Sequence, residues 1–379
     1  MRRRRSRAAI AAAVVFAATA IAACSSAPKA TPATTSATTT VVPATTTVVP
    51  PTTAEQATTT TTAATTTTTS TPTIPASTDA PATTVAPVTP LTIQQLLHLG
   101  RPIVLAHAGG EDQHPHSTPY GYAESVKEGV DMLDFDVQLS RDGVLVVQHD
   151  DSTGRTANAD VKIADTDYAD LLKLDNAYWF TTTCTCTGQP DSAYVLRGIR
   201  TGVKPPPPGY SPGDFIIPRF SDIVQRFPTM PLNIEIKGNG APAIAAAREL
   251  AKELTDLHRL SNAVVASFDD SIVDTFHQLA PTVEVTPGLN AASAFFLNHV
   301  ALPAGERILQ VPPKYGTLTV LTPESMAAVH AAGYVVWVWS DDESEENPAS
   351  YASLLQLGVD GLNINVPDQG VAAVKAFKR

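Results

Sequence analysis

Eight short apolar segments recur between residues 103 and 364, and this repetition is the strongest constraint on the fold. The segments are 103–107, 131–138, 231–237, 262–267, 282–286, 308–312, 334–339 and 360–364. Segments with helix signals separate them. Eight strand–helix units within residues 91–379 predict a (β/α)8 TIM barrel, a fold whose chemistry lies at the carboxyl ends of the strands.

Several of the intervening helices can be bounded from their ends. The pairs Thr118-Pro119, Thr322-Pro323 and Asn347-Pro348 suit the N-cap and first turn of a helix, and Gly129, Gly333 and Gly358 suit the matching stops. Apolar residues also recur at helical spacing between Ile244 and Leu257. These signals place helices between the strands, as the barrel requires.

Residues 151–230 are too many for an ordinary barrel loop, so we expect an insertion subdomain over the barrel mouth. Its Cys184 and Cys186 favour a disulfide in an exported protein, although free thiols are an alternative. A basic loop with Arg197, Arg200 and Lys204 could meet an anionic substrate, and a purely solvated loop is an equal alternative.

The stretch 103–151 gathers groups that can carry chemistry. Asp134 and Asp136 have strand spacing, so both carboxylates point to one face. The turn 140–143 contains an Asp-Gly pair that is typical of a hairpin, and the following strand ends in His149. A hairpin there returns His149 to the two aspartates, and His107 ends the first strand.

These residue types suit acid–base work and cation binding. Histidine titrates near neutral pH, and clustered carboxylates suit a hard divalent cation. A histidine at a strand end is often only solvated, but two acids on an apolar strand need a cation or a functional task. Glu235 and Lys237 share a face of a later strand. They could bind a cation and a phosphate oxygen, or they could form a structural salt bridge.

The motifs resemble the glycerophosphodiester phosphodiesterase family, a group of phosphodiesterase barrels related to phosphatidylinositol-specific phospholipase C. The family pattern runs HRG, PENT, an E-x-D strand, a KDG turn and a strand that ends in HD. The matching residues here are 107–109, 115–118, 134–136, 141–143 and 149–150. Ala108, His116 and Asp134 depart from the Arg, Glu and Glu of the pattern. The resemblance covers roughly residues 95–379.

The resemblance implies an enzyme that hydrolyses glycerophosphodiesters, or similar alkyl phosphodiesters, to glycerol phosphate and an alcohol. It implies His107 and His149 as general acid and base, and one divalent cation, Ca²⁺ or Mg²⁺. By the same resemblance the metal ligands are Asp134, Asp136 and Glu235, and the substrate contacts are Lys237, Trp337 and His116. Water or the neighbouring glycerol hydroxyl could be the nucleophile. The alternatives are a barrel that binds phosphodiesters or a wall polymer without turnover, and a phospholipase D-like lipid hydrolase.

The N-terminus is typical of an export signal. Five arginines precede an apolar run at Ala8–Ala20 that is too short to cross a membrane. Ile21-Ala22-Ala23-Cys24 resembles a bacterial lipobox, so residues 1–23 are predicted to be a signal peptide and Cys24 the lipidated residue. The expected location is the bacterial cell envelope, outside the cytoplasm. A secreted protein with an incidental Cys24 is the alternative.

Residues 24–90 have the composition of a stalk. Residues 25–90 contain almost only Thr, Ala, Pro, Val and Ser, with no glycine and no aromatic residue. Such a segment cannot bury enough apolar surface to offset its ordering entropy, so we expect a disordered linker.

The charge excludes some partners. The net charge is −11 and falls to −16 without the five arginines of residues 1–23. A chain this acidic is a poor binder of nucleic acid. The expected partners are therefore a small phosphodiester and, through the anchor, a membrane. We expect a monomer.

Overall fold

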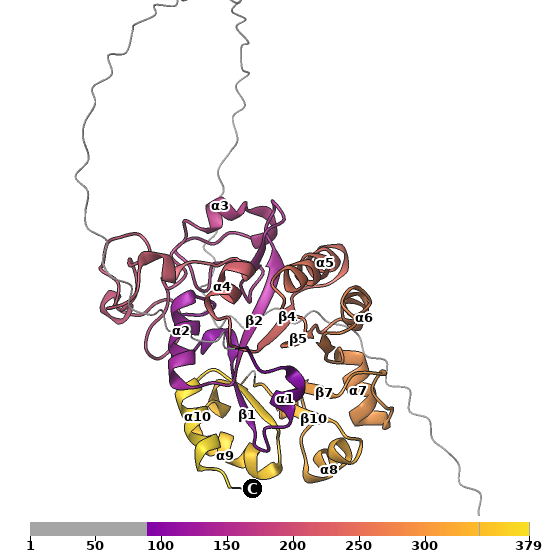
Figure 1. Cartoon of the computed structure of the whole chain (residues 1–379). Coiled ribbons are helices and arrows are strands. Elements are labelled where there is room, and N and C mark those ends of the chain that lie inside the picture. Colours follow the sequence, from indigo (N-terminus) through magenta and orange to yellow (C-terminus); the bar gives the residue numbers. More distant parts are fainter. Residues whose placement is uncertain (1–88, 341, 379) are drawn as a thin grey trace, which may run out of the picture. The chain divides into compact units, whose positions relative to one another are not determined.

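The structure is a computed structural model that describes residues 89–340 and 342–378 (Figure 1). The predicted signal peptide, the Cys24 anchor and nearly all of the predicted stalk lie outside these residues. Within the described ranges, no helix combines the length and the apolar character needed to cross a membrane.

Eight parallel strands form the barrel, and each coincides with one of the eight predicted segments, although β2 extends one residue beyond its segment. They are β1 (Ile103–Ala106), β2 (Met132–Leu139), β4 (Leu232–Ile236), β5 (Ala263–Ala266), β6 (Glu284–Val285), β7 (Ile308–Val311), β10 (Val335–Val338) and β11 (Gly361–Ile364). They pair in the order β6-β5-β4-β2-β1-β11-β10-β7. In the described chain β6 and β7 do not pair, so the barrel is nearly closed. The predicted TIM barrel is confirmed.

Helices surround the strands, as Figure 1 shows. They are α1 (Ile93–Leu97), α2 (Pro119–Glu128), α3 (Tyr168–Leu171), α4 (Phe220–Arg226), α5 (Gly240–Asp256), α6 (Asp270–Leu279), α7 (Leu289–Asn298), α8 (Pro323–Ala331), α9 (Pro348–Leu357) and α10 (Pro367–Ala376). The predicted caps are present. Thr118 accepts a hydrogen bond from the Gly121 amide, and Gly129 ends the same helix with φ 95°.

The amino-terminal half of the barrel interior is apolar. Ile93 and Leu96 of α1 pack against side chains that point inward from the strands. Trp337 is the largest of these and is 1% exposed. A Cβ atom on Gly361 would lie 2.6 Å from the Trp337 ring, so only glycine leaves room for the indole there. Polar residues of the interior are therefore confined to the opposite, carboxyl end.

The hairpin predicted from the Asp-Gly pair is present. Strand β3 (Leu145–Val147) pairs antiparallel with β2, with Val137 opposite Val147. The Gly143 amide donates to the Ser140 carbonyl, and Gly143 has φ 80°. This backbone conformation suits glycine and explains the tight return.

Residues 151–219 form short elements with two small apolar clusters of their own. One cluster centres on Tyr168 and Leu171, and the other on Phe180 and Phe215. Helix α4, which falls within the predicted insertion 151–230, instead buries its apolar face in the main barrel core. A disulfide joins Cys184 and Cys186.

Two arginines of this region make their contacts within the region. The Arg197 guanidinium lies over the rings of Tyr178, Trp179 and Tyr194, at 3.6–4.7 Å from their centroids. Arg200 donates to the Leu172 carbonyl. Both arginines therefore stabilise the insertion, which is neither of the roles expected from the sequence.

Candidate active site

The hairpin brings His149 to the buried acids of β2. The backbone N–H of Gln148 donates to the backbone carbonyl of Asp136 at 2.9 Å, which fixes the residue before His149 against β2. His107 directly follows β1, the strand beside β2. The imidazole rings of His107 and His149 lie edge to face, with centroids 5.8 Å apart. The structure thus brings together the two histidines that the sequence singled out.

Each of these histidines has an oxygen partner at its Nδ1 atom. His107 Nδ1 lies 2.8 Å from Asn365 Oδ1 and 3.4 Å from Glu111 Oε1. His149 Nδ1 lies 2.8 Å from Asp150 Oδ1. Such partners fix the orientation of an imidazole and leave its Nε2 atom for chemistry. Burial lowers the pKa of His107, but the hydrogen bond and charge of Glu111 and the nearby aspartates raise it to about 10.

Asp134 and Asp136 are both buried, but their surroundings differ. Asp134 accepts hydrogen bonds from the Asn233 and Asn363 amides. Burial raises its pKa to about 6, an effect that the charge of Asp136 adds to. Burial would also raise the pKa of Asp136, but the positive charge of Lys237 leads a set of charges that lowers it.

Glu235 is the third acid. It lies directly opposite Asp136 in the register of β2 and β4. Lys237 Nζ lies 3.1 Å from Glu235 Oε1 and 3.4 Å from Asp136 Oδ1, so its ammonium group bridges the two carboxylates. The salt bridge between Glu235 and Lys237, one of the two interpretations of this pair, is therefore present.

The acids have the donor chemistry of a cation site. Asp136 Oδ2 is buried and, within the part of the chain that the structure describes, has no hydrogen-bond partner. A buried oxygen of this kind is costly unless something satisfies it. Among the described residues, however, no three Asp, Glu, His or Cys side chains already have the arrangement of a metal site. The oxygens thus fit a hard cation in chemistry, while a lysine ammonium bridges two of the acids.

A cavity of about 310 Å³ opens at the carboxyl ends of the strands. One end is polar and contains His107, His149, Asp134, Glu235 and Lys237. The other end is apolar and is lined by residues that include Phe268, Leu289, Phe296, Leu297, Leu318 and Trp339. The cavity can therefore hold a molecule with a charged group at one end and an apolar group at the other.

Trp337, which was predicted to form a wall of the substrate site, does not line the cavity in the described structure. Trp337 lies in β10 and faces the barrel interior, and Trp339 follows one residue past the end of the strand, on the same side by alternation. Trp337 lies one layer deeper, packed with the α1 residues, and does not line the described cavity. Trp339, two residues closer to the carboxyl end, lines the cavity and packs against Phe268.

His116, which was predicted to contact the substrate, is likewise absent from the described cavity wall. Its side chain is 0% exposed and is not part of the cavity wall in the described structure. His116 Nε2 lies 3.3 Å from Glu111 Oε2, and its ring lies edge to face with His149 at 5.7 Å. Burial lowers its pKa to about 3, and the charge of Arg155 adds to this effect. The residue packs behind His149 and makes no contact with the cavity in the described structure.

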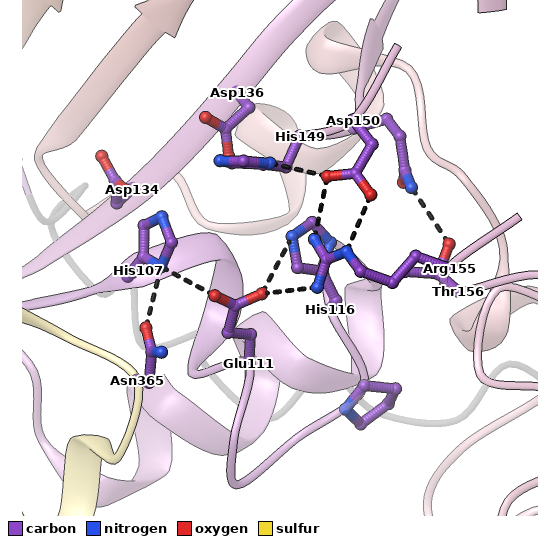
Figure 2. A network of polar contacts seen from close by, with 12 residues as sticks. His107, Glu111, His116, Asp134, Asp136, His149, Asp150, Arg155, Thr156 and Asn365 are labelled. Carbon is purple, nitrogen blue, oxygen red and sulfur yellow. Dashed lines mark hydrogen bonds and ion pairs between the residues drawn. The ribbon is translucent and has the colours of Figure 1, made fainter. Parts of the chain in front are cut away.

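Sequence reasoning missed the polar and charged partners of these histidines, which Figure 2 shows together. They are Glu111, Asp150, Arg155 and Asn365. Asp150 follows His149 directly and Glu111 is four residues after His107, so their positions were the available signal. Nothing local in the sequence relates Arg155 or Asn365 to either histidine.

A tight backbone turn places Glu111 beneath His107. Ala108, Gly109 and Gly110 all have left-handed φ angles, of 45°, 84° and 82°. A Cβ atom on Gly110 would lie 2.6 Å from the Pro367 ring, so glycine is required there. The turn reverses the chain after β1 and returns the Glu111 carboxylate to the imidazole.

The chain is similar to known phosphodiesterases over most of its length. The chain is 24% identical over 292 residues to a glycerophosphodiester phosphodiesterase of Bacillus subtilis, which covers 75% of this chain and 90% of that protein. It is 23% identical over 293 residues to a lysophospholipase D of Homo sapiens, which covers 69% of this chain and 83% of that protein.

Solved structures share the fold. A glycerophosphodiester phosphodiesterase from Agrobacterium tumefaciens has a TM-score of 0.53 at 19% identity, over 73% of this chain and 100% of that one. An Oleispira antarctica phosphodiesterase in complex with the product sn-glycerol-3-phosphate has a TM-score of 0.53 at 20% identity, over 74% and 99%. Residues 107–369 match the glycerophosphoryl diester phosphodiesterase family, and the chain belongs to this family of enzymes.

Proposed function

We propose that the protein hydrolyses glycerophosphodiesters, to glycerol phosphate and an alcohol, with the help of a divalent cation. The observation that carries the proposal is the meeting of His107 and His149 in one cavity, with ring centroids 5.8 Å apart, beside three carboxylates. A phosphodiester bond needs a proton removed from the nucleophile and a proton given to the leaving alkoxide. Two oriented imidazoles supply both groups.

The cation belongs with Asp134, Asp136 and Glu235. Enzymes of this family generally depend on a divalent cation, and these carboxylate oxygens suit Ca²⁺ or Mg²⁺. When bound, the cation neutralises non-bridging phosphate oxygens that the acidic site would otherwise repel. The unpartnered Asp136 Oδ2 supports this assignment. Lys237 bridges Asp136 and Glu235 in this structure and would turn its ammonium toward a phosphate oxygen when substrate binds.

The histidines divide the proton transfers. One of His107 and His149 takes a proton from the nucleophile, which is water or the neighbouring glycerol hydroxyl, and the other protonates the leaving alkoxide. The carboxylates at their Nδ1 atoms, Glu111 and Asp150, orient the rings and stabilise the protonated forms.

A second candidate substrate class follows from the apolar end of the cavity. Several residues at that end are exposed although they are apolar, including Phe268 at 48%, Leu297 at 47% and Leu318 at 41%. Exposed apolar groups beside a polar site mark a place for an apolar ligand group. A lysophospholipid would place its phosphodiester at the histidines and its acyl chain along these residues. The human relative named lysophospholipase D is in accord with this candidate.

The location that we propose follows from the sequence alone. Cys24 would carry a lipid anchor in the bacterial envelope, and residues 25–90 would join the anchor to the barrel. An anchored barrel with an exposed apolar rim could take a substrate directly from a membrane surface.

The first prediction concerns the cation. Excess chelator should abolish hydrolysis of glycerophosphocholine, and Ca²⁺ or Mg²⁺ should restore it, because the acidic site repels the substrate without a cation. Asp136→Asn should weaken cation binding measured by calorimetry, whereas Asp256→Asn, which changes an exposed acid on α5, should not. Full activity in excess chelator would contradict the metal assignment.

The second prediction concerns the histidines. His107→Ala and His149→Ala should each lower kcat by about 10²–10⁴-fold, the usual size of an acid–base contribution. The loss of kcat in the double variant should be much smaller than the product of the two single losses, since both residues serve one transition state. His98→Ala, a change at an exposed histidine, is the control. Near-normal turnover by His149→Ala would remove this mechanism.

The third prediction separates the two substrate classes. If lysophospholipids are substrates, Phe268→Ala and Trp339→Ala should lower kcat/KM for lysophosphatidylcholine about tenfold or more, through lost apolar contact. They should change kcat/KM for glycerophosphocholine little. Leu279→Ala, at an exposed leucine away from the cavity, is the matched control. Equal losses on both substrates would rule out an acyl-chain subsite.

The fourth prediction concerns the anchor. Cys24→Ala should move the protein from the membrane fraction into the medium, because the lipid attachment point is lost. The wild type should incorporate labelled fatty acid in the same cells. A wild type without label, together with an unchanged distribution of the variant, would show that Cys24 is not an anchor.

A further inference from the structure

Arg155 lies between the two carboxylates that contact the catalytic histidines (Figure 2). Its Nε and Nη2 atoms donate to the two oxygens of Asp150, at 2.7 and 3.0 Å. Its Nη1 atom donates to Glu111 Oε2 at 3.1 Å. A planar guanidinium suits such a double contact, because its donors form a rigid fork.

Each carboxylate uses its remaining contacts to hold a histidine. Asp150 Oδ1, which Arg155 also contacts, lies 2.8 Å from His149 Nδ1. Glu111 divides its two oxygens, with Oε2 toward Arg155 and Oε1 at 3.4 Å from His107 Nδ1. The result is one continuous chain of polar contacts from one catalytic imidazole to the other.

We propose that Arg155 is a positioning residue that fixes the relative placement of His107 and His149 through Glu111 and Asp150. This inference rests on the proposed acid–base roles of the two histidines and assigns a role to a residue that the hydrolytic scheme does not otherwise use. Acid–base catalysis needs both imidazoles within about 0.5 Å of their productive places at the same moment. A rigid connection between their carboxylate partners provides that.

Arg155 itself is not placed to bind the phosphate. It does not line the cavity in the described part of the chain, whereas both histidines and Glu111 do. Its fork is directed at the two carboxylates. It therefore acts on the reaction through the histidines.

The backbone beside Arg155 is fixed by a buried polar cluster. Thr156 Oγ1 accepts a hydrogen bond from the side-chain Nε2 of Gln148 at 3.0 Å and donates to Asn176 Oδ1 at 2.7 Å. Asn176 Nδ2 donates in turn to the carbonyl of His116 at 3.1 Å. Gln148 immediately precedes His149, so the turn that carries Arg155 is tied to the strand that carries the histidine.

His116 fills the space behind this arrangement without adding charge. Its ring lies against Glu111 and His149, and it is completely buried. Within the described chain its nitrogens make no hydrogen bond of normal geometry. A carboxylate at this position would add a third negative charge to Glu111 and Asp150, which one guanidinium could not balance.

The test compares Arg155→Gln with Arg141→Gln. Arg141 makes the same double contact with Asp167, but on the surface and away from the site, so it is a matched control. Imidazole ¹⁵N signals of His107 and His149 are recorded for both variants, with assignments from His107→Ala and His149→Ala. Arg155→Gln should change both sets of signals, and Arg141→Gln should change neither. A change at only one histidine, or at neither, would overturn the proposal.

Kinetics on glycerophosphocholine give the second readout. Arg155→Gln should lower kcat by about 10- to 100-fold, the usual cost of losing a partner that orients an active-site group. KM should stay within about twofold, because Arg155 does not contact the substrate. Arg155→Lys, which keeps the charge but loses the fork, should fall between. A raised KM with normal kcat would mean that Arg155 binds substrate, and the proposal would fail.

The two readouts separate the proposals. Arg155→Gln could change both histidine signals while the wild type shows no turnover of glycerophosphocholine. That result would support the placement of the histidines by Arg155 and reject the hydrolytic function. Thermal denaturation of each variant identifies any loss of folding. Should Arg155→Gln not fold, Arg155→Lys decides by the same criteria, with both imidazole signals altered and kcat reduced at constant KM.

Discussion

The burial of two negative charges in the barrel is the constraint on which the rest of the site depends. An unpaired buried carboxylate costs several kcal/mol, so Asp134 and Asp136 require compensation from their surroundings. Asparagine amides from β4 and β11 supply it for Asp134, and the Lys237 ammonium supplies it for Asp136. One oxygen, Asp136 Oδ2, is left without a hydrogen bond among the described residues. The carboxyl end of the barrel is therefore polar and incompletely satisfied, which is the condition that a cation and a phosphate would relieve.

Near these carboxylates, two charged residues of the site, Glu111 and Arg155, lie outside the family motifs. Ala108 and His116 stand where the family pattern has an arginine and a glutamate, which removes one charge of each sign. Glu111 and Arg155 return one of each, in contact with each other at 3.1 Å. In this chain the guanidinium of Arg155 contacts the carboxylate partners of the histidines and does not line the described cavity.

Local signals in the sequence were enough to predict the barrel and to single out His107 and His149, which the structure brings together. Short apolar runs located the strands, Thr-Pro and Asn-Pro pairs located helix starts, and one Asp-Gly turn returned His149 to β2. The same pattern does not give the depth of a side chain in the barrel, because alternation along a strand gives the face but not the layer. The sequence therefore pointed to Trp337, whereas Trp339 lines the described cavity. Burial of His116 and the contact between Glu111 and Arg155 depend on segments that are distant in the chain. No local period reports such contacts.

The central claim is that the carboxylates and the two histidines at the barrel mouth form one hydrolytic site. Phosphorus NMR of glycerophosphocholine incubated with the purified protein tests it most directly, because substrate diester and product monoester give separate signals. With Ca²⁺ or Mg²⁺ present, the diester signal should be replaced by that of glycerol phosphate. A diester signal that stays unchanged with either cation, in a protein shown to be folded, would contradict the claim.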